Sequence, residues 1–107
     1  SGEYGTAVAY LSQGGQGCIS VTANIAPKLC AELHNNWREG KFEKVFSINL
    51  RLAKIHHALF VESSPGPVKY AAHLLGLCSS ETRLPLVPIK DSTKHLIKET
   101  MTEVNLL

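Results

Sequence analysis

Histidine and cysteine are the residue types here best suited to metal or acid–base chemistry, and only His56 and His57 are adjacent. Neighbouring residues of an α-helix point about 100° apart, so these two imidazoles do not readily share one metal ion. His34, His73 and His95 each stand alone, and the sequence contains no CxxC or HExxH motif. The pattern therefore predicts no metal site, and we expect His56 and His57 at partly exposed or interface positions of a helix.

The candidate nucleophiles are equally isolated. Cys18 lies in a short β-branched run without a basic neighbour that would activate its thiol. Lys28 follows the start of a predicted helix and has no evident partner. The glycine-rich residues 14–17 precede a predicted strand, whereas a phosphate-binding loop follows its strand and opens a helix. With no Ser-His-Asp set either, the chain's own residues do not form a catalytic set.

Composition narrows the class of protein. The chain has 107 residues, of which 44% are hydrophobic and 19% charged, as in one small globular domain. A net charge of +2 without clustered basic residues argues against a nucleic-acid partner. No apolar run is long enough to span a membrane. Three widely spaced cysteines favour a reduced, cytoplasmic setting, and a chain that opens on Ser1 is compatible with a cleaved or truncated product.

The stretch from Gly17 to Leu29 organises the predicted fold. Residues 18–21 are mostly β-branched and follow glycines, which is typical of a strand, and residues 22–24 are polar turn formers. Pro27 then opens a helix. This is one βα unit, and a single strand cannot satisfy its own backbone. We therefore expect one piece of an α/β sheet or barrel whose other strands lie outside this sequence.

The rest of the pattern is helical. Apolar residues at three- and four-residue steps predict helices over 3–13, 26–38, 41–62, 67–75 and 92–105. Pro85 and Pro88 exclude a central strand over 84–89, so this apolar run is expected to lie over the helices. Asp91 or Ser92 is expected to cap the last helix.

The longest predicted helix carries a wide apolar stripe that requires a large partner surface. Its members are Phe42, Val45, Ile48, Leu52, Ile55 and Leu59. The unpaired strand and this stripe together predict self-association of the chain, by strand pairing between copies or by exchange of the long helices. The alternative is that the C-terminal helices fold back over the strand within one chain.

Five segments resemble the dihydrodipicolinate synthase (4-hydroxy-tetrahydrodipicolinate synthase) family. Gly17-Cys-Ile-Ser-Val-Thr-Ala-Asn-Ile-Ala-Pro27 resembles its last barrel strand and the following turn. Ser1-Gly2-Glu3 resembles its SGDD segment, and Leu59-Phe-Val-Glu-Ser-Ser-Pro-Gly-Pro-Val-Lys69 its LFVE-x-NPIPVK signature. Leu74-Leu-Gly-Leu77 and Arg83-Leu-Pro-Leu-Val-Pro88 resemble its LLGL and RLPLxP segments. The departures are Glu3 where Asp is usual and Gly66 where Ile is common.

The resemblance implies an α/β fold, the C-terminal part of a (β/α)8 TIM barrel followed by a helical domain. Gly17–Val21 would be strand eight, between helices seven and eight. Residues 1–40 would be the last βα units of the barrel and residues 41–107 the C-terminal helical domain, so the chain as it stands would be mainly helical. Active sites of such barrels lie at the C-terminal strand ends, which here are residues 1–2 and 20–23.

The resemblance also implies a chemistry. The family is a class I aldolase-type lyase of lysine and diaminopimelate biosynthesis that needs no added cofactor. A lysine forms a Schiff base with pyruvate, and the resulting enamine attacks aspartate semialdehyde with help from a tyrosine proton relay. The enzyme is a cytoplasmic homo-oligomer, typically a tetramer. The lysine and the relay belong to strands that this chain lacks.

Two positions of the site carry over. Ile19 matches the isoleucine whose backbone helps to hold pyruvate, and Gly2 is a candidate for shaping the floor of the same pocket. Lys28, Lys54 and Lys69 fall on predicted helices away from the barrel mouth, so none is assigned the Schiff base. The chain alone is therefore expected to be inactive. A non-enzymatic helical interaction module and another pyruvate aldolase of this fold, similar to sialic acid lyase, remain the alternatives.

Overall fold

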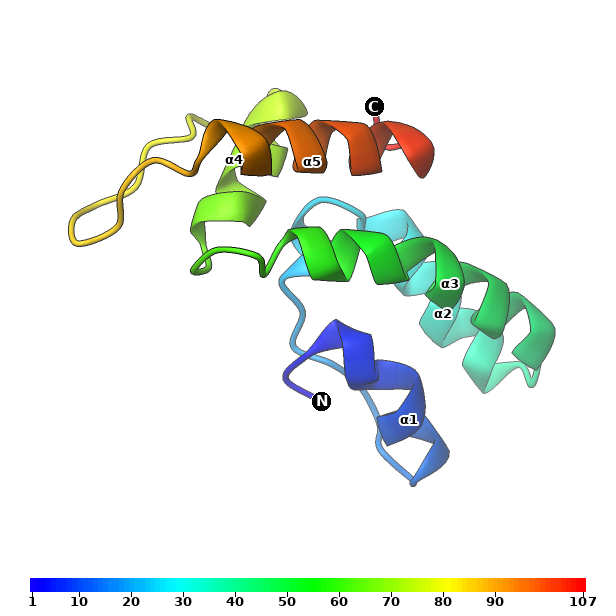
Figure 1. Ribbon diagram of the computed structural model, residues 1–107. Coiled ribbons are helices and arrows are strands. Elements are labelled where there is room, and N and C mark those ends of the chain that lie inside the picture. Colours follow the sequence, from blue (N-terminus) through cyan, green and yellow to red (C-terminus); the bar gives the residue numbers. More distant parts are fainter.

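The computed structural model describes residues 1–107 and is built of helices and loops, with no β-strand. The elements in chain order are η1 (Tyr4–Thr6), α1 (Ala7–Ser12), η2 (Thr22–Asn24), α2 (Pro27–Arg38), α3 (Phe42–Ala58), α4 (Gly66–Leu74) and α5 (Asp91–Glu103). Helices α2 and α3 lie side by side, and α5 runs above the second half of α3 (Figure 1). No helix combines the length and the apolarity needed to cross a membrane.

The ends of the helices follow from local chemistry. Pro27 occupies the first turn of α2, where a missing backbone N–H costs nothing. Gly40 and Gly76 follow α2 and α4 with φ of 72° and 77°, a left-handed conformation that glycine adopts without a Cβ clash. The short turn at Gly40 brings α3 back along α2 as a helical hairpin. The mainly helical structure predicted from apolar spacing is thus confirmed.

The cap expected for the last helix is wrong. Neither Asp91 nor Ser92 caps α5 through its side chain. Glu62, from the loop after α3, instead accepts the backbone N–H of Lys90 at 3.0 Å. The negative carboxylate of Glu62 lies at the positive end of the α5 dipole. A hydrogen bond with Thr93, followed by the bond from the Lys90 backbone, lowers the pKa of Glu62.

Two hydrophobic clusters share helix α3. The first cluster joins η1, α1, α2 and the first part of α3, with Tyr4, Leu11, Leu33, Val45 and Leu52 among its members. The second joins the end of α3 to α4 and α5, with Ile55, Leu59, Ala71, Ile97 and Met101 among its members. Because α3 contributes to both, it holds the N-terminal and C-terminal halves together. The predicted apolar stripe is buried at Val45, Ile48, Leu52, Ile55 and Leu59, while Phe42 is half-exposed.

The strand predicted at Gly17–Val21 is absent, and residues 15–20 form a loop. One trace of sheet geometry remains. The amino group of Ser1 donates to the carbonyl of Gly17 at 2.7 Å, and the N–H of Ile19 donates to the carbonyl of Ser1 at 2.8 Å. Ser1 thus bonds to the residues on either side of Cys18, through its own amino group and its own carbonyl. This is the hydrogen-bond pattern of two parallel strands. The segment lacks further partners, so no strand forms.

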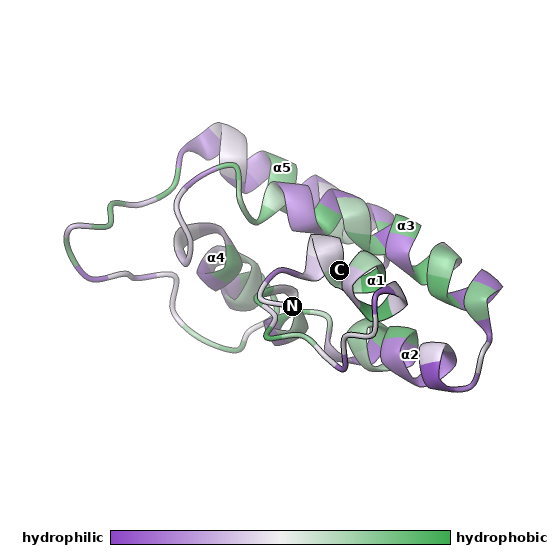
Figure 2. Ribbon diagram, turned by 90° about the horizontal axis from the view of Figure 1, so that it is seen from below, coloured by the Kyte–Doolittle hydropathy of each residue, from purple (hydrophilic) through white to green (hydrophobic).

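The apolar run over 84–89 also departs from expectation. Only Ile89 packs into the second cluster, while Leu84 and Val87 are 86% and 67% exposed. The loop between α4 and α5 extends away from the helices (Figures 1 and 2). Two prolines keep this run out of regular structure, as predicted, but they do not bring it onto the helices.

A second apolar surface lies on the outer side of α3, opposite its buried stripe. Phe46 and Leu50, one turn apart, are 51% and 75% exposed. Ile19 is 85% exposed, so the C-terminal helices do not cover the extended loop. The stripe that predicted self-association is thus buried within the chain except at Phe42, and the strand that predicted it is an exposed loop; Phe46 and Leu50 form a different apolar surface available for association.

The difference in burial along α3 predicts that two leucine substitutions will change the free energy of unfolding by different amounts. Leu52→Ala removes a fully buried side chain and is expected to lower the free energy of unfolding by about 2–5 kcal/mol. Leu50→Ala, at an exposed position, should change it by less than about 0.5 kcal/mol. Urea denaturation of the two variants measures both values. Equal effects would contradict the assigned face of α3.

The exposed face predicts how the chain associates. Phe46→Lys combined with Leu50→Lys should shift the chain toward monomer at micromolar concentration, because charge replaces the apolar contact area. Ser47→Lys adds one positive charge to the exposed side of α3 without removing apolar area and, compared with each single lysine variant, serves as the control. Sedimentation velocity gives the distribution of species. A wild-type chain that stays monomeric would overturn the prediction.

Candidate functional site

The structure brings Gly2 and Ile19 into one open hollow of about 500 Å³. Its lining residues are Ser1, Gly2, Tyr10, Gly17, Cys18 and Ile19. The two backbone bonds between Ser1 and residues 17 and 19 hold its two sides together. Neither the carbonyl of Ile19 nor the backbone of Gly2 makes a hydrogen bond within the chain. Burial raises the pKa of the Cys18 thiol, which keeps it protonated and unsuited to attack.

One side of the hollow is the N-terminal arm, residues 1–4. The hydroxyl of Ser1 accepts the N–H of Glu3 at 3.2 Å and shapes the first turn. Tyr4 then fixes the arm to α2, because its buried hydroxyl donates to the carbonyl of Cys30 at 2.9 Å. Burial, reinforced by Cys30, raises the pKa of Tyr4, so the phenol stays protonated and remains a donor.

The other side is the extended loop, residues 15–20, which leads into a tight turn at residues 20–25. The Ser20 hydroxyl accepts the N–H of Ala23 at 2.9 Å, closing the turn locally. Thr22 and Ile25 are buried, and they attach the turn to the helices. The Thr22 hydroxyl lies 2.8 Å from Nδ1 of His56 on α3. A threonine side chain thus links the loop to the long helix.

His56 occupies a partly exposed position of helix α3, as the sequence predicted. It is half-buried, and its ring lies 5.4 Å from the ring of Tyr4, centroid to centroid. Its Nε2 is buried and makes no hydrogen bond within the chain. Burial lowers the pKa of His56, with Glu3 acting in the opposite direction, so the imidazole is neutral near pH 7. The position of His56, four residues after Leu52 and so at the edge of the buried stripe, is the feature of the sequence that indicates its partial burial.

The two adjacent histidines do not come together. His56 faces Thr22, whereas His57 is exposed beside Ala53 and Leu96. No group of three His, Cys, Asp or Glu residues in the chain could hold a metal ion. The imidazoles of His56 and His57 thus have different surroundings, as predicted for adjacent residues of a helix.

The lysines lie elsewhere. Lys28 is exposed at the start of α2, and Lys54 forms an exposed ion pair with Glu103 at 2.9 Å. Lys69 lies on α4. None of the three lines the hollow that contains Gly2 and Ile19.

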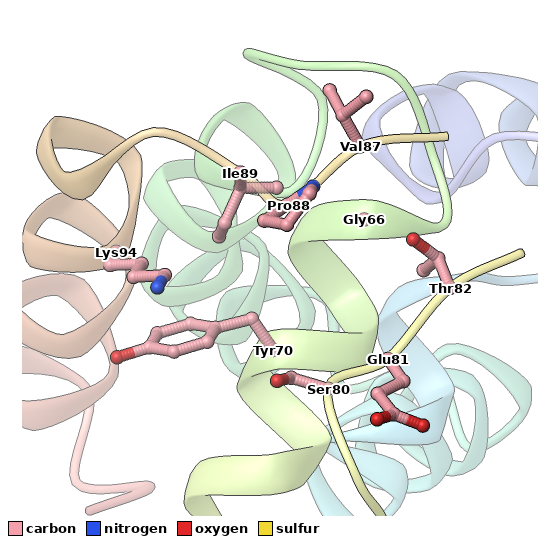
Figure 3. Close-up of a pocket in the computed structure, with 9 residues that line it drawn as sticks. All are labelled: Gly66, Tyr70, Ser80, Glu81, Thr82, Val87, Pro88, Ile89 and Lys94. Carbon is pink, nitrogen blue, oxygen red and sulfur yellow. The ribbon is translucent and has the colours of Figure 1, made fainter. Parts of the chain in front are cut away.

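A separate pocket of about 320 Å³ lies between α4 and the loop before α5 (Figure 3). Tyr70 and Lys94 face each other in it, with Nζ of the lysine 5.7 Å from the ring centroid. Gly66 forms part of its wall, where a Cβ would lie 3.0 Å from Ile89 Cγ2. The pocket shares no residue with the hollow at Gly2 and Ile19, so it is a different surface.

Comparison with known proteins decides the family. The profile of the dihydrodipicolinate synthetase family matches residues 1–104. This chain belongs to that family. Over all 107 residues it is 53% identical to the 4-hydroxy-tetrahydrodipicolinate synthase of Gluconacetobacter diazotrophicus and 50% identical to that of Rhodospirillum centenum. It spans 36% and 37% of the lengths of these two family members.

Solved structures of the family contain the same arrangement of helices. Dihydrodipicolinate synthase from Thermotoga maritima superposes on the whole chain with a TM-score of 0.97 at 40% identity. The chloride-inhibited enzyme from Acinetobacter baumannii, crystallised with pyruvate, superposes with a TM-score of 0.93 at 34% identity. The chain covers 36% and 37% of these two structures.

The buried imidazole predicts a pH dependence of folding. Burial lowers the pKa of His56 and of His34 in the folded chain, while unfolded histidine titrates near about pH 6.5. Below that pH the unfolded state binds more protons than the folded state, so the free energy of unfolding should fall as the pH falls. Urea denaturation between pH 7.5 and pH 5 measures the slope.

His56→Asn should reduce this slope, because it removes one of the two buried imidazoles. His57→Asn, at the exposed neighbouring position, is the matched control and should retain the wild-type slope. Equal slopes for wild type and His56→Asn would contradict the account of His56.

Proposed function

We propose that this chain is the C-terminal part of a pyruvate-dependent, class I aldolase-type lyase of lysine and diaminopimelate biosynthesis. The reaction is the condensation of pyruvate with aspartate semialdehyde. The observation that carries the proposal is 53% identity over the full 107 residues to a 4-hydroxy-tetrahydrodipicolinate synthase. The pyruvate bound to the Acinetobacter baumannii relative supports the choice of first substrate.

Within that enzyme the chain contributes to binding pyruvate. Ile19 lines the hollow, and its unpaired carbonyl is the backbone group that we assign to pyruvate. Gly2 lines the same hollow, and apart from its two chain neighbours no atom lies within 4 Å of the place where its Cβ would be. A glycine there leaves room for a small ligand. The Schiff-base lysine and the proton relay lie outside residues 1–107, so this chain positions substrate and performs no covalent step.

The helical part, residues 41–107, supports the end of the barrel. Helix α3 packs on α2 and, through His56 and Thr22, on the turn that follows the extended loop. Its outer apolar face, with Phe46 and Leu50, is a candidate contact in the homotetramer typical of the family. We treat residues 1–40 as the last βα units of the barrel and residues 41–107 as the C-terminal helical domain.

A chimera tests the proposal. It joins the part of the Gluconacetobacter diazotrophicus enzyme that precedes the match to residues 1–107 of this chain. The chimera should condense pyruvate with aspartate semialdehyde and, with borohydride, trap pyruvate on a lysine outside these residues. The 107-residue chain alone should form no adduct, because the groups that activate pyruvate each contribute a factor of about 10² or more.

Two outcomes would contradict the proposal. The first is a covalent adduct on a lysine of the 107-residue chain. The second is a folded chimera, verified by circular dichroism, that fails to condense the two substrates. The unmodified relative, expressed and assayed in the same way, is the positive control.

A further inference from the structure

We propose that His56 is a positioning residue that holds both sides of the pyruvate-binding hollow in register from helix α3. The inference rests on the function proposed above and concerns a side chain that does not touch the hollow. His56 is absent from the hollow's lining, yet it contacts the segment that follows each of the two predicted substrate-binding positions.

The contact with the extended loop is a hydrogen bond. Thr22 lies three residues after Ile19, and its hydroxyl is 2.8 Å from Nδ1 of His56. The other hydrogen bonds of this turn are local, from Ala23 to Ser20 and from Asn24 to Val21. Among the hydrogen bonds of the turn, only the Thr22–His56 bond joins it to α3. Its loss removes the one hydrogen bond that fixes the turn, three residues after Ile19, to helix α3, and leaves only the packing of residues such as Ile25 to hold the turn there.

The contact with the N-terminal arm is made between aromatic rings. Tyr4 lies two residues after Gly2, and its ring lies 5.4 Å from His56 and 5.6 Å from His34, centroid to centroid. The Tyr4 hydroxyl is already committed to the carbonyl of Cys30. The Tyr4 ring therefore holds the N-terminal arm against α3, while the Tyr4 hydroxyl holds the arm against α2.

The chemistry of imidazole suits both contacts. A neutral ring offers a nitrogen to the Thr22 hydroxyl and a flat surface to Tyr4 at the same time. Asparagine could keep the first contact and phenylalanine the second, but neither could keep both. The neighbours Ile55 and Leu52 are fully buried, so α3 is a rigid base for this side chain.

The test uses the chimera described above and removes the hydrogen bond to Thr22 while a ring remains beside Tyr4. His56→Phe and Thr22→Val each remove the hydrogen bond, and each should raise the KM for pyruvate by roughly tenfold. We expect kcat and the KM for aspartate semialdehyde to stay within about twofold, because the reacting groups lie elsewhere. The double variant should match the single variants, since both substitutions remove one shared interaction.

Thr22→Ser, which keeps the hydroxyl, should retain the wild-type KM for pyruvate. His57→Phe is the control for placing the same side chain on the neighbouring position of α3, and it should also retain the wild-type KM. If His56→Phe fails to fold, the comparison of Thr22→Val with Thr22→Ser still decides the question.

The two proposals fail differently. An inactive wild-type chimera would count against the proposed function. An active chimera in which His56→Phe and Thr22→Val bind pyruvate as wild type does, or lose kcat while KM stays unchanged, would overturn the positioning role alone.

Discussion

The backbone of residues 17–20 needs hydrogen-bond partners that the chain supplies only through Ser1. The carbonyl of Gly17 and the N–H of Ile19 are paired with that residue, at 2.7 and 2.8 Å. The parallel arrangement of this one link sets the two sides of the hollow side by side. The amides of Cys18 and Ser20 remain unpaired, which is the expected condition of a barrel strand whose neighbours belong to another part of the polypeptide.

The helices do not depend on those missing strands. Helix α3 takes part in both hydrophobic clusters and links the hairpin with α2 to α4 and α5. This explains why the helices of the full-length Thermotoga maritima enzyme superpose on those of the chain with a TM-score of 0.97 although the chain spans 36% of it. The side of the chain that contains the hollow is attached to this helical base through Tyr4 and Thr22, and both of these residues contact His56.

Apolar periodicity predicted most of the helical structure, because the burial of a stripe is a local property of the sequence. Leu52 and Ile55 are buried as that spacing requires, and Gly40 ends α2. The β-branched residues 18–21 indicate a strand, but they do not determine whether it forms in this chain. A strand forms only when a second segment supplies the hydrogen-bond partners of its backbone.

Tertiary contacts account for the other differences. Sequence reasoning offered Asp91 and Ser92 as caps for α5, but Glu62, distant in sequence, accepts the bond at its N-terminus. It likewise placed His56 and His57 at partly exposed or interface positions of a helix and identified no partner for His56. The bond from His56 to Thr22 joins residues 34 positions apart, which no local pattern encodes.

The central claim is that residues 17–21 are a barrel strand whose partners lie outside this chain. Amide hydrogen exchange at Cys18 and Ser20 tests it most directly, in the 107-residue chain held monomeric by dilution and in the chimera with the missing barrel. The account predicts exchange close to that of an unfolded peptide in the chain alone, and slowing by about 10³ or more in the chimera. Strong protection of both amides in the monomeric chain, or none in the chimera, would contradict it.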